Sequence, residues 1–223
     1  MRSNSHLRTL LVACFALVVA LSLVSSATAK QKIHLTAAGH AAARAVVVKR
    51  VDLGNVGGWT GGAQKPDLSS EVACANFHEK ESDLVLNGAA KTVWKHTGLE
   101  FTSESEVLQT SRMVRLDWQR TVLSPQLLPC LRSQTKKQES PGVRLISLRR
   151  IGIPQIAPYA AAYRIVMDVK VSGATVRMMS DMVLVGRGRT EITLTTVAAL
   201  GAKSAVWPAE IRLARILVSR IRA

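Results

Sequence analysis

The chain has few aromatic residues, few acidic residues and few cysteines, and each shortage narrows the functions open to it. Aromatic residues make up 4% of its 223 positions. This argues against nucleic-acid binding, because single-stranded nucleic acid is held largely by stacking on aromatic side chains. Acidic residues number 15 against 30 lysines and arginines, which gives a formal net charge of +15. The excess favours anionic partners such as lipid headgroups or acidic polymers.

Recognisable catalytic and cofactor motifs are also missing. The sequence contains no G-x-S-x-G nucleophile elbow and no H-E-x-x-H zinc motif. The glycine-rich residues 51–62 have neither dinucleotide nor P-loop spacing, and they follow a predicted helix where a phosphate site would precede one. We therefore predict no catalytic residue, no metal and no cofactor. We interpret Gly54 as a helix stop, followed by a turn that places Trp59 on the domain.

The N-terminus has the pattern of an export signal. Arg2 and Arg8 flank the start of an apolar run over residues 10–24, and Ala27-Thr28-Ala29 matches an A-x-A cleavage motif. The run is shorter than the roughly 20 residues that a membrane-spanning helix needs, and no later run is longer. We expect residues 1–29 to be a signal peptide, with an uncleaved anchor as the alternative, and residues 30–223 to form one domain without a transmembrane span.

Two cysteines follow the predicted cleavage site, Cys74 and Cys130. Outside the cytoplasm two cysteines usually pair, and a loop of this length would stabilise the fold by about 4 kcal/mol. A zinc site made by these cysteines with His78 and His96 is the alternative, although no C-x-x-C or H-x-x-x-H accompanies them. We predict a disulfide and a secreted or extracytoplasmic location.

Hydrophobic periodicity predicts three helical regions separated by strands. The helices are expected at residues 37–50 behind the N-cap Thr36, from the N-cap Ser111, and from Pro208 at the first helical position. Strands are expected from Leu84 and at residues 99–108, 143–148, 159–171 and 190–196. We predict a two-layer α+β domain, with an antiparallel sheet of five to six strands and N-terminal, middle and C-terminal helices covering one face.

One hairpin can be predicted to the residue. Ser172-Gly173 is a two-residue turn signal after the alternating residues 159–171. The resulting register places Arg164 opposite Asp181 and Asp168 opposite Arg177. Because an arginine partner lowers the pKa of a carboxyl group, these aspartates are poor candidates for a general acid.

With these elements placed, the sequence resembles a known group of proteins. The segments that match are "DLGNVGGW", "SDLVLNGAA", "DWQRTV", "YAAAYRIVMDV", "DMVLVGRGRTEITLT" and "RLARILVSRI". They resemble uncharacterised exported proteins of high-GC Gram-positive bacteria. The architecture of that group is similar to the PsbP-type α/β fold of mycobacterial lipoproteins and of the extracellular sensor domain of the kinase PknH. The resemblance implies a protein that binds or assembles rather than an enzyme.

We therefore expect an exported, non-enzymatic domain that binds a ligand or a partner, which could be an envelope protein, a lipid or an anionic polymer. The predicted binding surface consists of Trp59, Trp94, Arg164, Arg177, Asp181, Arg187 and Arg189. Two alternatives stay open. One is a hydrolase with a dispersed site, which would show a deep pocket with convergent His, Asp or Glu side chains. The other is a structural adaptor that binds anionic polymer through Arg187, Arg189 and the C-terminal arginines.

Overall fold

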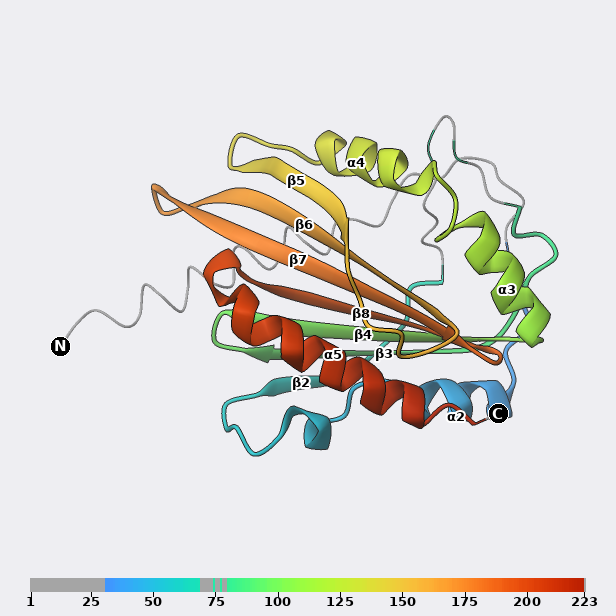
Figure 1. The fold of residues 1–223 in the computed structure, drawn as a ribbon. Helices are drawn as coiled ribbons and strands as arrows, with labels where there is room; N and C mark the ends of the chain where they lie inside the picture. Colours follow the sequence, from blue (N-terminus) through green and yellow to red (C-terminus); the bar gives the residue numbers. More distant parts are fainter. Residues whose placement is uncertain (1–30, 69–73, 75–76, 78–79, 223) are drawn as a thin grey trace.

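A large, mostly antiparallel sheet forms the centre of the protein (Figure 1). The computed structural model describes residues 31–68, 74, 77 and 80–222, so the predicted signal peptide and His78 lie outside the described residues. The strands are β1 (Lys32–Ile33), β2 (Thr60–Gln64), β3 (Val85–His96), β4 (Leu99–Leu108), β5 (Val143–Ile151), β6 (Tyr159–Val171), β7 (Ala174–Arg187) and β8 (Thr190–Ala199). They pair in the order β1-β3-β4-β8-β7-β6-β5, and β2 also pairs with β3. The described sheet has eight strands, which is more than the five to six predicted.

The hairpin of β6 and β7 has the predicted register. Arg164 lies opposite Asp181 and Asp168 opposite Arg177. Ser172 and Gly173 form the turn with positive φ angles of 46° and 84°, the left-handed geometry that two-residue hairpins favour. Local alternation and turn chemistry are therefore sufficient to fix this pairing.

Four α-helices and two short 3-10 helices accompany the described sheet. They are α2 (Ala37–Ala45), η2 (Arg50–Leu53), α3 (Ser111–Arg120), α4 (Leu127–Lys137), η3 (Leu200–Ala202) and α5 (Lys203–Ser219). Three predicted boundaries are wrong. The first helix ends at Ala45, because the next three residues are valines that are buried in the core. Thr110, rather than Ser111, is the N-cap of α3. Pro208 lies inside α5 instead of at its start.

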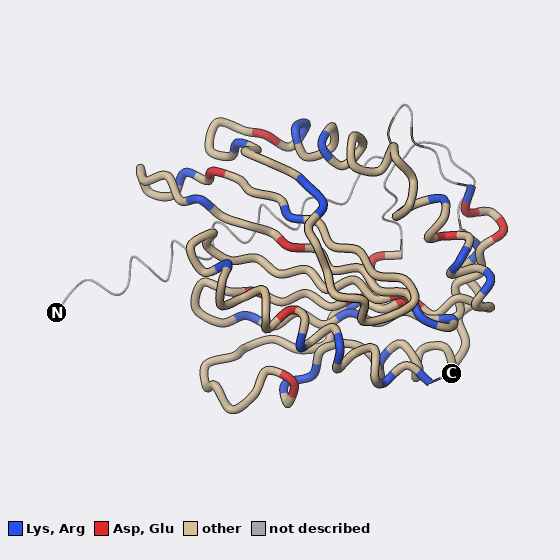
Figure 2. The backbone as a smooth tube through the Cα atoms, in the orientation of Figure 1, with Lys and Arg blue, Asp and Glu red and all other residues tan. Residues whose placement is uncertain are grey.

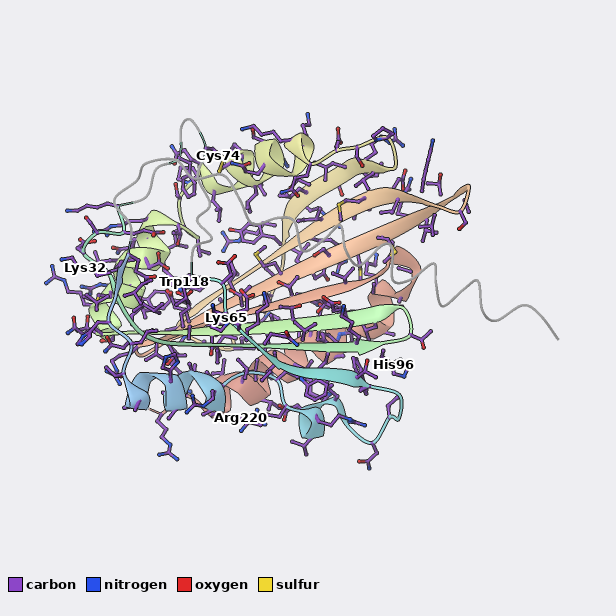
Figure 3. All side chains as sticks on the ribbon, turned by 180° about the vertical axis from the view of Figure 1, so that it is seen from behind. Lys32, Lys65, Cys74, His96, Trp118 and Arg220 are labelled. Atoms are coloured by element: carbon purple, nitrogen blue, oxygen red, sulfur yellow. A yellow bond between two sulfur atoms is a disulfide. The ribbon has the colours of Figure 1, made fainter. Side chains whose placement is uncertain are left out.

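The helices cover both faces of the sheet, which corrects the predicted two-layer arrangement. One core cluster contains Val183 and Leu217, and so joins β7 to α5. A second contains Tyr163 and Trp118, and so joins β6 to α3. Figure 1 shows α5 in front of the strands, and Figure 3, turned by 180°, shows it behind them. Helices α2 and α5 thus lie on one face, and α3 and α4 on the other, because the central strands have apolar residues on both sides.

Helix α2 approaches β3 closely through two glycines. A Cβ atom on Gly39 would lie 2.1 Å from the carbonyl oxygen of Asn87, and one on Gly88 would lie 2.1 Å from the carbonyl carbon of Gly39. Thr36 begins the helix by accepting a hydrogen bond from the backbone N–H of Gly39 at 2.9 Å. The absence of side chains at both glycines is therefore what allows the helix to lie directly on the strand.

The predicted disulfide is confirmed. Cys74 and Cys130 are bonded with a Cα–Cα distance of 5.6 Å, and Figure 3 shows Cys74 beside α4. The bond ties the segment between β2 and β3 to the helix. Among the described residues, no helix is long and apolar enough to cross a membrane.

Candidate functional site

The candidate site is a pocket of about 340 Å³ on the face of the sheet that α3 and α4 cover. This volume is within the range of small-molecule sites. The α3 end of α4, the start of β3 and the segment that follows β2 complete its walls. Figure 3 shows Lys65, in that segment, in front of the strands on this side.

One wall of the pocket is apolar. Strand alternation turns Tyr163, Met182 and Leu184 toward this face. The Tyr163 hydroxyl donates to the backbone carbonyl of Val122 at 3.2 Å, which holds the ring against the segment between α3 and α4. The remaining apolar lining residues are Ile33, Leu68, Leu84, Val122, Leu127 and Leu131. This wall suits a hydrocarbon or ring portion of a ligand.

The other wall is a group of carboxyl side chains. Glu106 and Glu191 are direct neighbours across the β4–β8 pairing, and Asp117 of α3 is near enough to Glu191 for each to shift the pKa of the other. Glu104, one position along the same face, is paired with Lys91 at 2.5 Å. Glu106, Asp117 and Glu191 are called the carboxyl cluster below.

Gly186 and Trp118 set the position of Glu191. Gly186 is the β7 partner of Glu191, and a Cβ atom built there would lie 2.6 Å from the Trp118 indole nitrogen. The missing side chain lets the indole lie over the strand, and Trp118 lowers the pKa of Glu191 against the larger effect of burial. Figure 3 shows Trp118 at this end of the sheet.

The carboxyl cluster holds protons more tightly than isolated carboxyls do. Burial, followed by the negative charges of Asp117, Glu104 and Glu81, raises the pKa of Glu106 from 4.5 to about 7. Burial, followed by the charges of Asp117 and Glu106, raises the pKa of Glu191 well above 4.5. Burial also raises the pKa of Asp117, against the opposing effects of Glu191 and Arg120. At neutral pH the cluster is therefore only partly ionised.

The pocket contrasts in charge with the rest of the chain. Six of its lining residues are acidic, and none of the described lining residues is lysine, arginine or histidine: Asp67, Glu81, Glu104, Glu106, Asp117 and Glu191. The whole sequence has a net charge of +15. No group of three or more His, Cys, Asp or Glu in the described part of the chain is arranged to hold a metal ion. The described lining of the pocket is therefore acidic in a chain that is basic overall.

The binding surface predicted from the sequence lies elsewhere and is divided. Arg164 and Asp181 are buried beneath α5, with exposures of 6% and 0%, so neither belongs to an accessible surface, which corrects the prediction. Their ion pair neutralises both charges and so lets α5 cover this part of the sheet. Arg177, Arg187 and Arg189 are exposed in the β6–β7 and β7–β8 hairpins.

The two tryptophans have different environments. The Trp59 ring stacks on Phe101 with 5.6 Å between ring centroids and contacts His96 at 5.2 Å, so it packs against the core. The Trp94 indole N–H donates to the backbone carbonyl of Val48 at 2.9 Å, and the ring lines a separate groove beside α2. None of the seven predicted surface residues lines the carboxyl pocket.

The carboxyl cluster was missed because its members are far apart in the sequence. Nothing local in the sequence brings Glu191 to Glu106, which lies on a partner strand, or to Asp117, which lies on a helix. The spacing of Glu104 and Glu106 in one strand was the available signal, since i and i+2 share a face.

Comparisons with known proteins give no family. No protein-family model and no curated protein matches the chain. Among solved structures, PA94 of Pseudomonas aeruginosa, a protein of unknown function, is 12% identical over 70% of this chain and 95% of its own, with a TM-score of 0.29. LpqN of Mycobacterium tuberculosis, involved in cell envelope biogenesis, is 11% identical over 73% of this chain and 83% of its own, with a TM-score of 0.26.

Proposed function

We propose that this chain is an exported, non-enzymatic binding domain whose ligand enters the carboxyl pocket, and that the ligand is a small organic cation with an apolar portion. The observation that supports this most directly is that six of the described lining residues of the pocket are acidic and none is basic, in a strongly basic protein. The apolar wall beside the carboxyl cluster would accept the uncharged part of the ligand. The disulfide supports the extracytoplasmic location, because such bonds persist in oxidising compartments.

Binding of a cation should be coupled to proton release. A carboxyl group that is protonated in the empty pocket must ionise to form an ion pair, so the cation competes with the proton. With the pKa of Glu106 at about 7, the affinity should rise as pH increases from 6 to 8. An uncharged ligand of the same shape should show no such rise.

Isothermal titration calorimetry with matched alkylamines and alcohols tests the proposal. We expect octylamine to bind more tightly than octanol, and its binding at pH 7 to release protons, seen as a heat that depends on the ionisation enthalpy of the buffer. Glu191→Gln should weaken octylamine binding by about tenfold or more, the loss of one buried charge-assisted contact. Equal affinity for amine and alcohol would overturn the proposal.

Glu139→Gln is the matched control for this experiment. Glu139 is exposed outside the pocket and accepts from the backbone N–H of Leu145 at 2.8 Å, and the glutamine oxygen can keep that bond. The control should bind octylamine as the unmodified chain does. A loss as large as that of Glu191→Gln would show a general charge effect instead of a pocket.

A hydrolase is the second candidate, and the raised pKa of Glu106 specifically favours it. A carboxyl group with a pKa of about 7 can act as a general acid near neutral pH while a neighbouring carboxylate acts as a base. The two functions differ in outcome. A binding domain returns its ligand unchanged after incubation, whereas mass spectrometry would detect hydrolysis products from an enzyme, and Glu106→Gln would stop their formation.

A further inference from the structure

The side of the molecule opposite the carboxyl pocket presents exposed cations around two exposed valines. The cations are Arg44 of α2, Lys49 beside η2, and Arg212 and Arg215 of α5, all of which are exposed. Val51 is 76% exposed and Val56 is 58% exposed, more than any other large hydrophobic residue described. These six residues are called the basic rim. Figure 2 shows the blue positions along α2 and the C-terminal half of α5 at the lower side of the view.

Specific contacts bring the parts of the basic rim together. Arg50 donates to the backbone carbonyls of Gly54 and Val56, each at 2.8 Å, and so fixes the loop that exposes the two valines. Arg212 of α5 donates to the backbone carbonyl of Asp52 at 2.9 Å, which ties the helix to η2. The rim is therefore a defined surface built from three elements.

Among the described residues, the cations of the basic rim meet little opposing charge. Asp52, the acidic residue in this stretch, is 6% exposed, and its carboxylate is held by the guanidinium of Arg220. Arg44 and Lys49 line a groove of about 450 Å³ between α2 and the β2–β3 edge, whose described lining contains no acidic residue. An anion approaching this side meets cations without a competing carboxylate.

We propose that the basic rim docks on the surface of an anionic lipid bilayer. Exposed valines lose contact with water only if the partner has an apolar layer, and the flanking cations require phosphate at the boundary of that layer. A bilayer surface offers an apolar layer and phosphate groups within the few ångströms over which an interfacial segment inserts. A soluble anionic polymer would engage the cations and leave Val51 and Val56 in water, so the valines decide between these partners.

Site-specific fluorescence tests the insertion of the rim. An environment-sensitive probe is attached at Val51→Cys in the full chain with Cys14→Ser, since Cys74 and Cys130 are disulfide-bonded. On vesicles of phosphatidylcholine with about one third phosphatidylglycerol, the emission should shift to the blue. A probe at Val176→Cys, in the β6–β7 hairpin, is the matched control and should stay water-exposed. On chain captured by a soluble polyphosphate the probe at position 51 should stay unshifted. An unshifted probe at position 51 on the vesicles would overturn the proposal.

Charge substitutions give a second, independent readout. Arg44→Gln with Lys49→Gln should weaken vesicle binding by roughly fivefold for each cation removed. The control pair is Arg112→Gln with Arg115→Gln, exposed arginines of α3 on the other side of the sheet, and it should bind within about twofold of the unmodified chain. Because every variant keeps residues 1–29, any lipid affinity of that segment is the same in all of them. Equal losses in both pairs would show a net-charge effect and contradict docking through the rim.

Discussion

Glu210 provides the sharpest test of the electrostatics of this fold. Its carboxyl group is fully buried between α5 and the sheet, as is that of Asp181. Arg164 donates to Asp181 at 2.6 Å through Nε and also through a terminal nitrogen, and its guanidinium lies 5.9 Å from the centre of the Trp207 ring. Arg164 is thus near two carboxyl groups, those of Asp181 and Glu210, but it donates its hydrogen bonds to Asp181.

Glu210 must therefore hold a proton in the folded protein. Burial, followed by the negative charge of Asp181, raises its pKa from 4.5 to about 8. Because the folded pKa lies above the unfolded value, the stabilisation is complete below pH 4.5 and is lost as pH rises through 8. These two values imply a loss on the order of 4 kcal/mol between pH 5 and pH 9.

Glu210→Gln should remove this pH dependence. The glutamine amide keeps the shape of the protonated acid and a donor for Asp181, but it cannot ionise. Urea unfolding at pH 5, 7 and 9 should show the unmodified chain falling below the variant by several kcal/mol at the highest pH, with little difference at pH 5. Since the carboxyl cluster also titrates, the difference between the two proteins is the quantity of interest. If both lost the same free energy of unfolding between pH 5 and 9, Glu210 would already be ionised at pH 5 and the assignment of the arginine would be wrong.

Three further substitutions test the packing, again by urea unfolding. Gly39→Ala should destabilise the fold by roughly 3 kcal/mol through overpacking, because the new Cβ would lie 2.1 Å from a backbone oxygen of β3. The control is Gly57→Ala, which has open space around it and should change stability by less than about 0.5 kcal/mol. Equal effects of the two substitutions would refute the close approach of α2 to β3. Cys74→Ser opens a disulfide that spans 56 positions and should lower stability by about 4 kcal/mol, a loss that reduction of the unmodified chain should reproduce. Asp52→Asn leaves the partly exposed guanidinium of Arg220 without its charge partner and should lower stability by about 2 kcal/mol at pH 7. Hydrogen bonds from Arg220 and from the backbone of Lys49 hold the pKa of Asp52 low despite burial. The difference between the two proteins should therefore shrink in acid.

Local sequence was enough to predict the β6–β7 hairpin but not the sheet as a whole. Alternation and the Ser172-Gly173 turn fixed every pair in that hairpin, because its two strands are adjacent in the chain. The pairing of β4 with β8 joins segments more than eighty positions apart, and no local pattern specifies it. The two shortest strands were missed because β1 has two residues and β2 has two glycines among five, which leaves almost no periodicity to detect.

The position of the helices was mispredicted for a different reason. Arg164 and Asp168 alternate with apolar neighbours in β6, and the sequence pattern therefore indicated a solvated face. In the structure a bidentate ion pair removes the charge of Arg164 and Asp181 from the surface, and α5 covers them. Asp168 is held instead by the exposed arginines at positions 144 and 177. Alternation alone cannot separate a solvated face from a buried and neutralised one.

The sheet separates the two charged features of the molecule, and this separation bears on whether both can operate together. Glu106 and Glu191 point toward the face covered by α3 and α4, whereas Arg44 and Arg212 belong to helices on the opposite face. The basic rim and the pocket therefore lie on opposite sides of the sheet, and a bilayer under α2 and α5 would leave the pocket on the water-facing side. Octylamine affinity measured with the chain bound to anionic vesicles should then equal the affinity in solution, after correction for partition of the amine into lipid. A loss of affinity on vesicles would mean that the pocket, and not the rim, faces the membrane.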